Sequence, residues 1–214
     1  MDFDNPADAE KGMVLDHVDD QFLVGPAIMQ APLLHASQQR RMVVLPSAQN
    51  SRWFDACTGH FISAGQVIQV TSSESATPLY VREGAILPMQ IGERVSPTND
   101  LSKLELHVFL GQGCDQTATL DYRADDGHSF AYQRGERSQL RVQARREGHT
   151  LWVELACPAQ GWQAFELSIV AYDGIDRLVV KTPRGDIEQS PTPHHWRFTG
   201  QVLNAVMGQP ITLA

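Results

Sequence analysis

The chain has 214 residues, a formal net charge of -8, 42% hydrophobic residues and 3 cysteines. A chain of this length forms one large domain or two domains of about a hundred residues each, and such domains can bury a core without disulfides or metals. The acidic balance argues against a nucleic-acid partner. No apolar run reaches the length of about 18 residues that a membrane-spanning helix needs, so no membrane partner is expected either.

The cysteines and histidines do not suggest a metal site. Cys57, Cys114 and Cys157 stand far apart without a C-x-x-C spacing, so buried free thiols are expected, although one disulfide stays open. Neighbouring residues on a strand point to opposite faces, so His194 and His195 are not expected to share one ion. We therefore predict no metal, no cofactor and no catalytic residue in this chain.

Within residues 1–18, Asn5, Pro6 and Gly12 predict one or two helical turns that end at Gly12. Asp2 and Asp4 could divide acid and base roles, but two carboxylates without an assembled site around them are better interpreted as solvated side chains. The start at Met1 shows no signal peptide. The compartment stays open, and the cytoplasm is favoured for this chain.

The rest of the chain predicts an all-β fold with two antiparallel β-sandwich domains in tandem. In residues 19–100 each short apolar run stops at Gly, Pro or Ser, which indicates strands broken by turns. The polar, turn-rich segment 92–102 marks the domain boundary, and a second domain follows at 101–214. There apolar residues alternate with polar ones, as on strands with one solvated face; the runs are 104–110, 118–122, 140–144, 151–155 and 165–171. Hairpin turns are expected at 125–127, 134–136 and 146–149.

Five motifs between Asp19 and Met89 follow one another at compatible spacings. They have the forms D-x-Q-F/Y-x-x-G, an apolar strand ending in A-P, V/F-Y-L-P, W-Y-D-x-W-T-G and P-L-F/Y-V-R-x-G-x-I-L/I-P. In this order they resemble glycoside hydrolase family 31, the α-glucosidase and α-xylosidase group. Gln30 departs from the family, which usually has an apolar residue there. The matching residues are Asp20, Gln21, Phe22, Gly25, Ala31, Pro32, Leu45, Pro46, Trp53, Phe54, Asp55, Thr58, Gly59, Pro78, Leu79, Tyr80, Val81, Arg82, Gly84, Ile86, Leu87 and Pro88.

A sixth pattern resembles the distal C-terminal domain of the same family, Y-x-D-D-G-x-x-x-x-Y-x-x-G. It comprises Tyr122, Asp125, Asp126, Gly127, Tyr132 and Gly135, with one extra residue after Tyr122. A calcium loop is the alternative interpretation of the adjacent carboxylates. It is disfavoured because calcium takes six to eight oxygen ligands and the spaced EF-hand pattern is missing.

The resemblance implies a role for each part of the chain. Residues 1–18 would be the end of the catalytic barrel, 19–100 the proximal C-terminal sandwich and 101–214 the distal one. In the family both catalytic Asp residues lie on barrel strands upstream of this region, so the chain is expected to be inactive alone. The parent enzyme would hydrolyse α-linked glycosides with retention. The barrel is the expected partner of this region, and self-association is also plausible for such sandwiches.

The alternative function is a free-standing carbohydrate-binding or partner-docking sandwich. If the apolar positions of their strands face the core, Trp152 and Phe109 point outward, where an aromatic ring packs against another domain or stacks on a sugar. Trp162 is a further candidate for such a platform. Trp53 could also stack a sugar, but its apolar neighbours favour core packing. The adjacent charges of Arg82 and Glu83 are expected to be paired for structural reasons.

Overall fold

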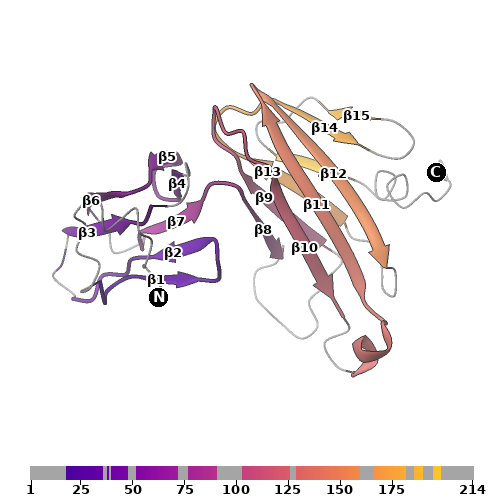
Figure 1. Ribbon diagram of the computed structural model, residues 1–214, viewed down its shortest axis with the longest axis horizontal. Helices are drawn as coiled ribbons and strands as arrows, with labels where there is room; N and C mark the ends of the chain where they lie inside the picture. Colours follow the sequence, from indigo (N-terminus) through magenta and orange to yellow (C-terminus); the bar gives the residue numbers. More distant parts are fainter. Residues whose placement is uncertain are drawn as a thin grey trace. The chain divides into compact units, whose positions relative to one another are not determined.

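The structure, a computed structural model, is almost entirely β. It describes residues 18–35, 38, 40–47, 52–71, 77–90, 103–125, 129–159, 166–181, 186–189 and 195–198. Within these ranges the one helical element is a short 3-10 helix, η1 (Ala131–Arg134). The expected all-β class is therefore confirmed. The chain divides into two compact units, residues 1–83 and 84–214, and the ribbon of each is shown in Figure 1.

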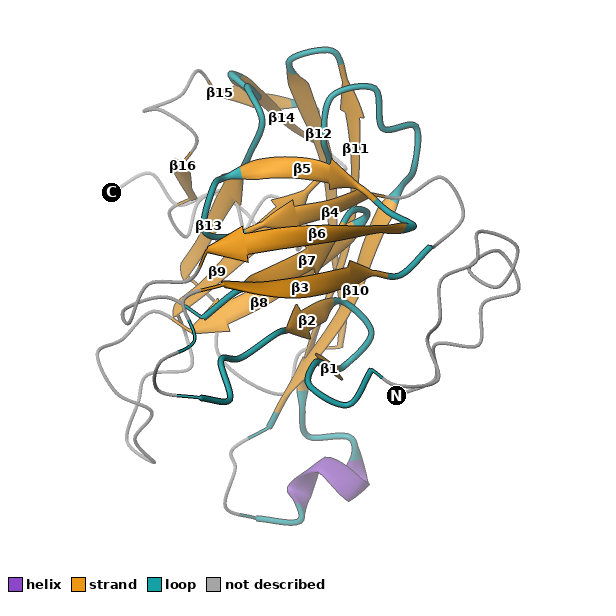
Figure 2. Cartoon of the chain, turned by 90° about the vertical axis from the view of Figure 1, so that its left-hand side faces the viewer, coloured by secondary structure: helices purple, strands orange, loops and turns teal. Residues whose placement is uncertain are grey.

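The first unit contains a five-stranded sheet of order β1-β2-β7-β4-β5 and a two-stranded sheet, β3-β6. All of its strand pairs are antiparallel. The two sheets share one apolar core of Met29, Ala31, Val43, Leu45, Trp53 and Tyr80, and Figure 2 views them face-on. The strands are β1 (Phe22–Val24), β2 (Ile28–Gln30), β3 (Arg40–Leu45), β4 (Arg52–Asp55), β5 (His60–Ser63), β6 (Gln66–Thr71) and β7 (Leu79–Arg82).

The second unit is a sandwich of a five-stranded sheet, β10-β11-β12-β14-β15, and a four-stranded sheet, β16-β13-β9-β8. Its core takes the alternate residues of these strands, such as Leu106 from β9 and Val153 from β12, both 0% exposed. Full burial of one such side chain contributes about 1.5–3 kcal/mol. The strands are β8 (Ala85–Gln90), β9 (Lys103–Phe109), β10 (Ala118–Ala124), β11 (Ser138–Glu147), β12 (Thr150–Ala159), β13 (Glu166–Ala171), β14 (Arg177–Lys181), β15 (Ile187–Gln189) and β16 (His195–Phe198).

The division between the units lies earlier than the boundary that we expected at residue 101. Strand β8 precedes the polar segment 92–102, yet it pairs antiparallel with β9, with Ala85 opposite Phe109. The polar segment, which lies outside the described residues, therefore connects two strands of one sheet. Composition identifies a connection, but it does not say whether the connection joins two domains or two neighbouring strands.

The sandwich of the second unit is not purely antiparallel. β9 and β13 are parallel, with Leu104 opposite Leu167, and so are β12 and β14, with Leu151 opposite Leu178. The alternation of apolar and polar residues shows which face of a strand is buried. It does not distinguish parallel from antiparallel pairing, because the buried face is the same in both. The hairpin expected around Gly135 is also absent: Gly135 ends η1 in a left-handed conformation (φ 88°), inside the connection between β10 and β11.

The tight turn between β11 and β12 depends on Gly148. Its φ is +59°, and a Cβ added there would have no atom within 4 Å, so a substitution is opposed by the backbone alone. We expect Gly148→Ala to lower the free energy of unfolding by about 1 kcal/mol. Gly148→Asn should cost less, because Asn tolerates this region better. Urea unfolding of both variants measures this, and an unchanged midpoint for Gly148→Ala would contradict it.

Candidate functional site

Trp152 lies on the outer face of β12, where its alternation with Leu151 and Val153 places it. Both of these neighbours are fully buried, whereas Trp152 is partly exposed. The guanidinium carbon of Arg145, directly opposite on β11, lies 5.1 Å from the centre of the indole ring, and the Lys181 amine on β14 lies 5.7 Å from it. Cations from both neighbouring strands therefore contact the ring, an arrangement that holds the ring in place.

A small hollow of about 110 Å³ adjoins Trp152 and is also lined by Gln143 and Glu154. The Glu154 carboxylate lies 3.2 Å from the Lys181 amine. Within the described part of the chain, the buried indole Nε1 of Trp152 has no hydrogen-bond partner. The hollow thus offers an amide, a carboxylate and an indole N–H, groups that can hydrogen-bond a hydroxylated ligand.

Phe109 does not join Trp152, because it belongs to the other sheet of the sandwich. Its side chain is 4% exposed, and its ring stacks on Tyr172 with centroids 4.9 Å apart. The Tyr172 hydroxyl lies 2.5 Å from Nδ1 of His107, whose Nε2 lies 2.7 Å from a Glu105 carboxylate oxygen. Burial, and then the charge of Glu105, raise the pKa of Tyr172. A ring covered in this way is a packing residue. Trp162 lies outside the described residues.

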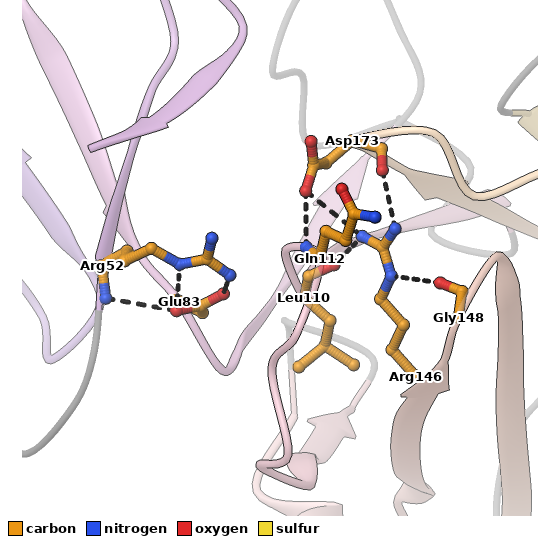
Figure 3. Close-up of polar contacts among 7 residues, drawn as sticks. All are labelled: Arg52, Glu83, Leu110, Gln112, Arg146, Gly148 and Asp173. Atoms are coloured by element: carbon orange, nitrogen blue, oxygen red, sulfur yellow. Dashed lines mark hydrogen bonds and ion pairs between the residues drawn. The ribbon is translucent and has the colours of Figure 1, made fainter. Parts of the chain in front are cut away.

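Trp53 and the charges near it serve the core of the first unit. Trp53 is 0% exposed, and its Nε1 donates to the Pro46 carbonyl at 3.0 Å. Glu83 pairs with Arg52 rather than with its neighbour Arg82: the two Arg52 nitrogens Nη2 and Nε reach the two carboxylate oxygens at 2.5 and 3.0 Å (Figure 3). Glu83 is therefore paired within its own unit, but the expected pair between Arg82 and Glu83 is not formed: the Arg82 guanidinium lies over the Trp53 ring instead.

A buried arginine connects three loops at one end of the second unit. The side chain of Arg146 is 2% exposed. It donates to the carbonyls of Leu110, Gly148 and Asp173 at 2.9, 2.7 and 2.8 Å, and it lies 3.4 Å from a carboxylate oxygen of Asp173. That oxygen also accepts the backbone N–H of Gln112 at 2.5 Å (Figure 3). We call this group the Arg146 cluster. Sequence reasoning missed it.

The outer face of β10 and β11 carries a smaller polar group. Hydrogen bonds from Gln139 (2.7 Å) and Arg123 (3.1 Å) to Asp121 hold the pKa of that carboxyl below its ordinary value. A lowered folded-state pKa means that the ionised carboxylate stabilises the fold above its ordinary pKa, and that this contribution is lost as the pH falls. We expect Gln139→Ala to raise the pKa of Asp121, as measured by carboxyl NMR titration. An unchanged pKa would contradict this assignment.

The described part of the chain holds no group of three His, Cys, Asp or Glu side chains that could share a metal ion. None of the described helical structure is long and apolar enough to cross a membrane. Of the thiols, Cys57 is exposed and Cys114 is partly buried, and both are free, so the expectation that Cys57 is buried was wrong. The side chains of His194 and His195 lie outside what the structure describes, as does the 126–127 part of the expected calcium-like turn.

Comparison with known proteins shows which family this chain resembles. Residues 2–87 match the glycosyl hydrolase family 31 C-terminal domain. The chain is 29% identical over 119 residues to an α-xylosidase of Saccharolobus solfataricus, covering 55% of this chain and 15% of that protein. It is 25% identical over 175 residues to α-glucosidase 2 of Bacillus thermoamyloliquefaciens, covering 82% of this chain and 22% of that protein.

Solved structures extend the likeness in fold. The α-xylosidase of Xanthomonas citri superimposes with a TM-score of 0.59 at 24% identity, over 84% of this chain and 19% of that one. A dextranase of Flavobacterium johnsoniae gives 0.61 at 18% identity, over 74% and 19%. The chain thus spans about a fifth of the length of these proteins. Residues 2–87 are similar to the glycosyl hydrolase family 31 C-terminal domain, and the chain as a whole resembles the C-terminal region of family 31 enzymes.

Proposed function

We propose that the chain is the non-catalytic C-terminal β-sandwich region of a retaining α-glycoside hydrolase, and that it packs on the catalytic barrel and stabilises it. The observation that carries this proposal is the position and extent of the likeness. The matched family is a C-terminal domain, and the chain covers 15% and 22% of relatives named α-xylosidase and α-glucosidase. In this account the rest of the enzyme supplies the two carboxylates of a retaining mechanism.

The buried charges of the described residues support a structural role. The Glu83 carboxylate is engaged by Arg52, and the Arg146 guanidinium donates to backbone carbonyls of neighbouring loops. A catalytic acid or base must instead lie within reach of the proton that it moves on a substrate. These pairs hold strands and loops of their own units together.

The outer face of the β3-β6 sheet offers a surface for such packing. Met42 and Val44 lie on one face of β3, and Val67 lies directly opposite Val44 on β6. Met42 is 53% exposed and Val67 46% exposed. Large apolar side chains that adjoin on an exposed sheet face are typical of an interface. We propose that these three residues contact the barrel.

An interface test compares the isolated chain with the enzyme that contains it. Met42→Asp together with Val67→Asp should change the free energy of unfolding of the isolated chain by less than about 0.5 kcal/mol, because both side chains are exposed. In the enzyme the same pair should remove about 2–4 kcal/mol of apolar burial and lower the melting temperature. Thr71→Asp is the control, because Thr71 is exposed and lies on β6, the strand that carries Val67. Equal melting temperatures for both variant enzymes would exclude this surface.

An activity test addresses the non-catalytic role. The purified chain is incubated with aryl α-glucoside and aryl α-xyloside, and release of the aryl group is followed. We expect no release above buffer. Saturable release that disappears when the chain is thermally unfolded would overturn the proposal.

Carbohydrate binding at Trp152 is the second candidate function. It is supported by the unpartnered Nε1 and by the polar hollow that Gln143 and Glu154 line. Against it, Arg145 and Lys181 already contact the ring. Calorimetric titration with α-linked oligosaccharides decides between the two functions. We expect no binding. Saturable binding that Trp152→Ala abolishes and Gln143→Ala weakens would favour the second function.

A further inference from the structure

Arg82, at the end of β7, carries a charge that no described residue neutralises. Its neighbour Glu83 is bound by Arg52, whose Nη2 and Nε reach the two carboxylate oxygens. Arg41 of the same unit pairs with Asp20 at 2.7 Å. Among the described residues, however, the Arg82 guanidinium forms no ion pair and donates no hydrogen bond. The first unit therefore holds one partly buried arginine that lacks the carboxylate its two counterparts have.

The unpaired guanidinium is held in place by an aromatic ring. Trp53 lies directly opposite Arg82 in the sheet, and the guanidinium carbon of Arg82 lies 5.2 Å from the centre of its ring. The ring itself is fixed, because Trp53 is 0% exposed and its Nε1 donates to the Pro46 carbonyl. A cation over an aromatic face is attracted to it. Trp53 thus positions the Arg82 guanidinium before any partner arrives.

The nitrogens of the Arg82 side chain differ in burial. The residue as a whole is partly exposed, but its Nε is buried without a hydrogen-bond partner. In the described part of the chain Nη1 and Nη2 are not among the buried atoms of this kind, so they remain accessible. An arginine stays charged at every physiological pH, and partial burial of an unpaired charge is costly. An anion at Nη1 and Nη2 would offset that cost.

The chemistry of the guanidinium restricts the anion. Its planar fork matches the two oxygens of a carboxylate, with one N–H donated to each. A nucleic acid or another polyanion is disfavoured because the chain carries a net charge of -8. A single guanidinium holds a free anion only weakly, since the anion loses its freedom of motion on binding. A carboxylate on a docked polypeptide is instead presented at a high effective concentration.

We propose that Arg82 pairs with the carboxylate of an Asp or Glu on the catalytic barrel, with Nη1 and Nη2 each donating to one oxygen. This inference rests on the proposed function, because it takes the barrel as the partner. Arginines beside aromatic rings are typical of the few residues that dominate an interface. The pair adds a directional contact to the proposed docking surface, which the apolar side chains of Met42, Val44 and Val67 do not supply.

Chemical cross-linking in the enzyme that contains the chain tests the pair. The Arg82→Lys variant is treated with a water-soluble carbodiimide, which joins an amine to a carboxylate in contact with it as an amide, with loss of water. Linked peptides are identified by mass spectrometry after proteolysis. We expect one link from position 82 to an Asp or Glu outside this chain. A link from position 82 to a carboxylate of this chain, whether of the same copy or of a second one, would overturn the proposal.

Arg52→Lys is the matched control for the chemistry. Arg52 contacts Glu83 in the same unit, so this variant should give a link between positions 52 and 83 in both the enzyme and the isolated chain. Arg82→Lys should give its link in the enzyme alone. If Arg52→Lys is linked and Arg82→Lys is not linked in the enzyme, the proposed pair does not exist.

Melting temperatures give a second readout. In the isolated chain Arg82→Met should shift the melting temperature by less than about 2 °C, because it removes a cation–π contact together with a buried unpaired donor. In the enzyme it leaves a carboxylate without its partner, so a decrease on the order of 5 °C is expected. Arg40→Met, at an exposed arginine of the same unit, should change neither value. Equal shifts of Arg82→Met in the chain and the enzyme would contradict the pair.

Failure of this inference is distinguishable from failure of the proposed function. If the native chain occurs in no α-glycosidase, the proposed function fails, and the pair fails with it. If the chain does occur in such an enzyme but position 82 links to nothing outside the chain, the pair alone is overturned. The apolar contacts proposed for Met42 and Val67 would then stand or fall by their own variants.

Discussion

Replacement of Arg146 by methionine is expected to lower the free energy of unfolding of the second unit by about 3–5 kcal/mol. The guanidinium is 2% exposed and donates to the carbonyls of Leu110, Gly148 and Asp173. Methionine fills much of the same volume but donates nothing, so these carbonyls lose their partner. Hydrogen exchange of the β11 and β12 amides in increasing urea measures the loss in the unit concerned.

Arg141→Met is the matched control, because Arg141 lies on the same strand but is exposed. We expect it to change the free energy of unfolding by less than about 0.5 kcal/mol. Equal effects of the two variants would show that the Arg146 cluster contributes no more to the free energy of unfolding than a solvated arginine does. A further consequence is local: in Arg146→Met the loop amide of Gln112, which bonds Asp173, should exchange faster than in the wild type.

Trp53→Ala is expected to lower the free energy of unfolding of the first unit by about 3–5 kcal/mol. The side chain is 0% exposed and belongs to the core that both sheets share. It also donates to the Pro46 carbonyl and supports the Arg82 guanidinium, which lies 5.2 Å from the centre of its ring. Alanine leaves a cavity and an unpaired carbonyl. Hydrogen exchange of the β4 and β7 amides measures the effect.

Two further variants calibrate this result. Trp53→Phe keeps an aromatic ring but loses the N–H, so a smaller loss of about 1–2 kcal/mol is expected. Phe22→Ala removes a ring that is 45% exposed on β1 and should cost less than about 1 kcal/mol. If Trp53→Ala cost no more than Phe22→Ala, the core assignment of Trp53 would be wrong.

The strands were predictable because burial of one sheet face leaves a two-residue period. In β9 and β12 the apolar positions 104, 106 and 108 and 151, 153 and 155 are the buried ones. The same period placed Trp152 and Phe109 on outer faces. It did not predict that Phe109 is buried there, because the residue that stacks on it, Tyr172, comes from a distant segment, directly after β13. Contacts between distant segments leave no local pattern.

The Arg146 cluster was only partly predictable from the two-residue period of apolar residues. Along β11 the inward positions are Leu140, Val142 and Ala144, so Arg146 continues the buried face. A charge at an inward position predicts a buried, partnered side chain. The partners, however, come from other loops. The Asp-Gly pair at 173–174 signals a turn, but nothing in it says that the left-handed residue Asp173 (φ 61°) lies beside Arg146.

The size of the native species that carries this chain tests the proposed function most directly. A cell extract is separated by size-exclusion chromatography, and each fraction is probed with an antibody against the chain and assayed for α-glycoside hydrolysis. The account predicts that the antibody signal elutes at several times 23.7 kDa, the mass of the chain, together with α-glycosidase activity. A signal that elutes near 23.7 kDa in fractions without that activity would contradict it.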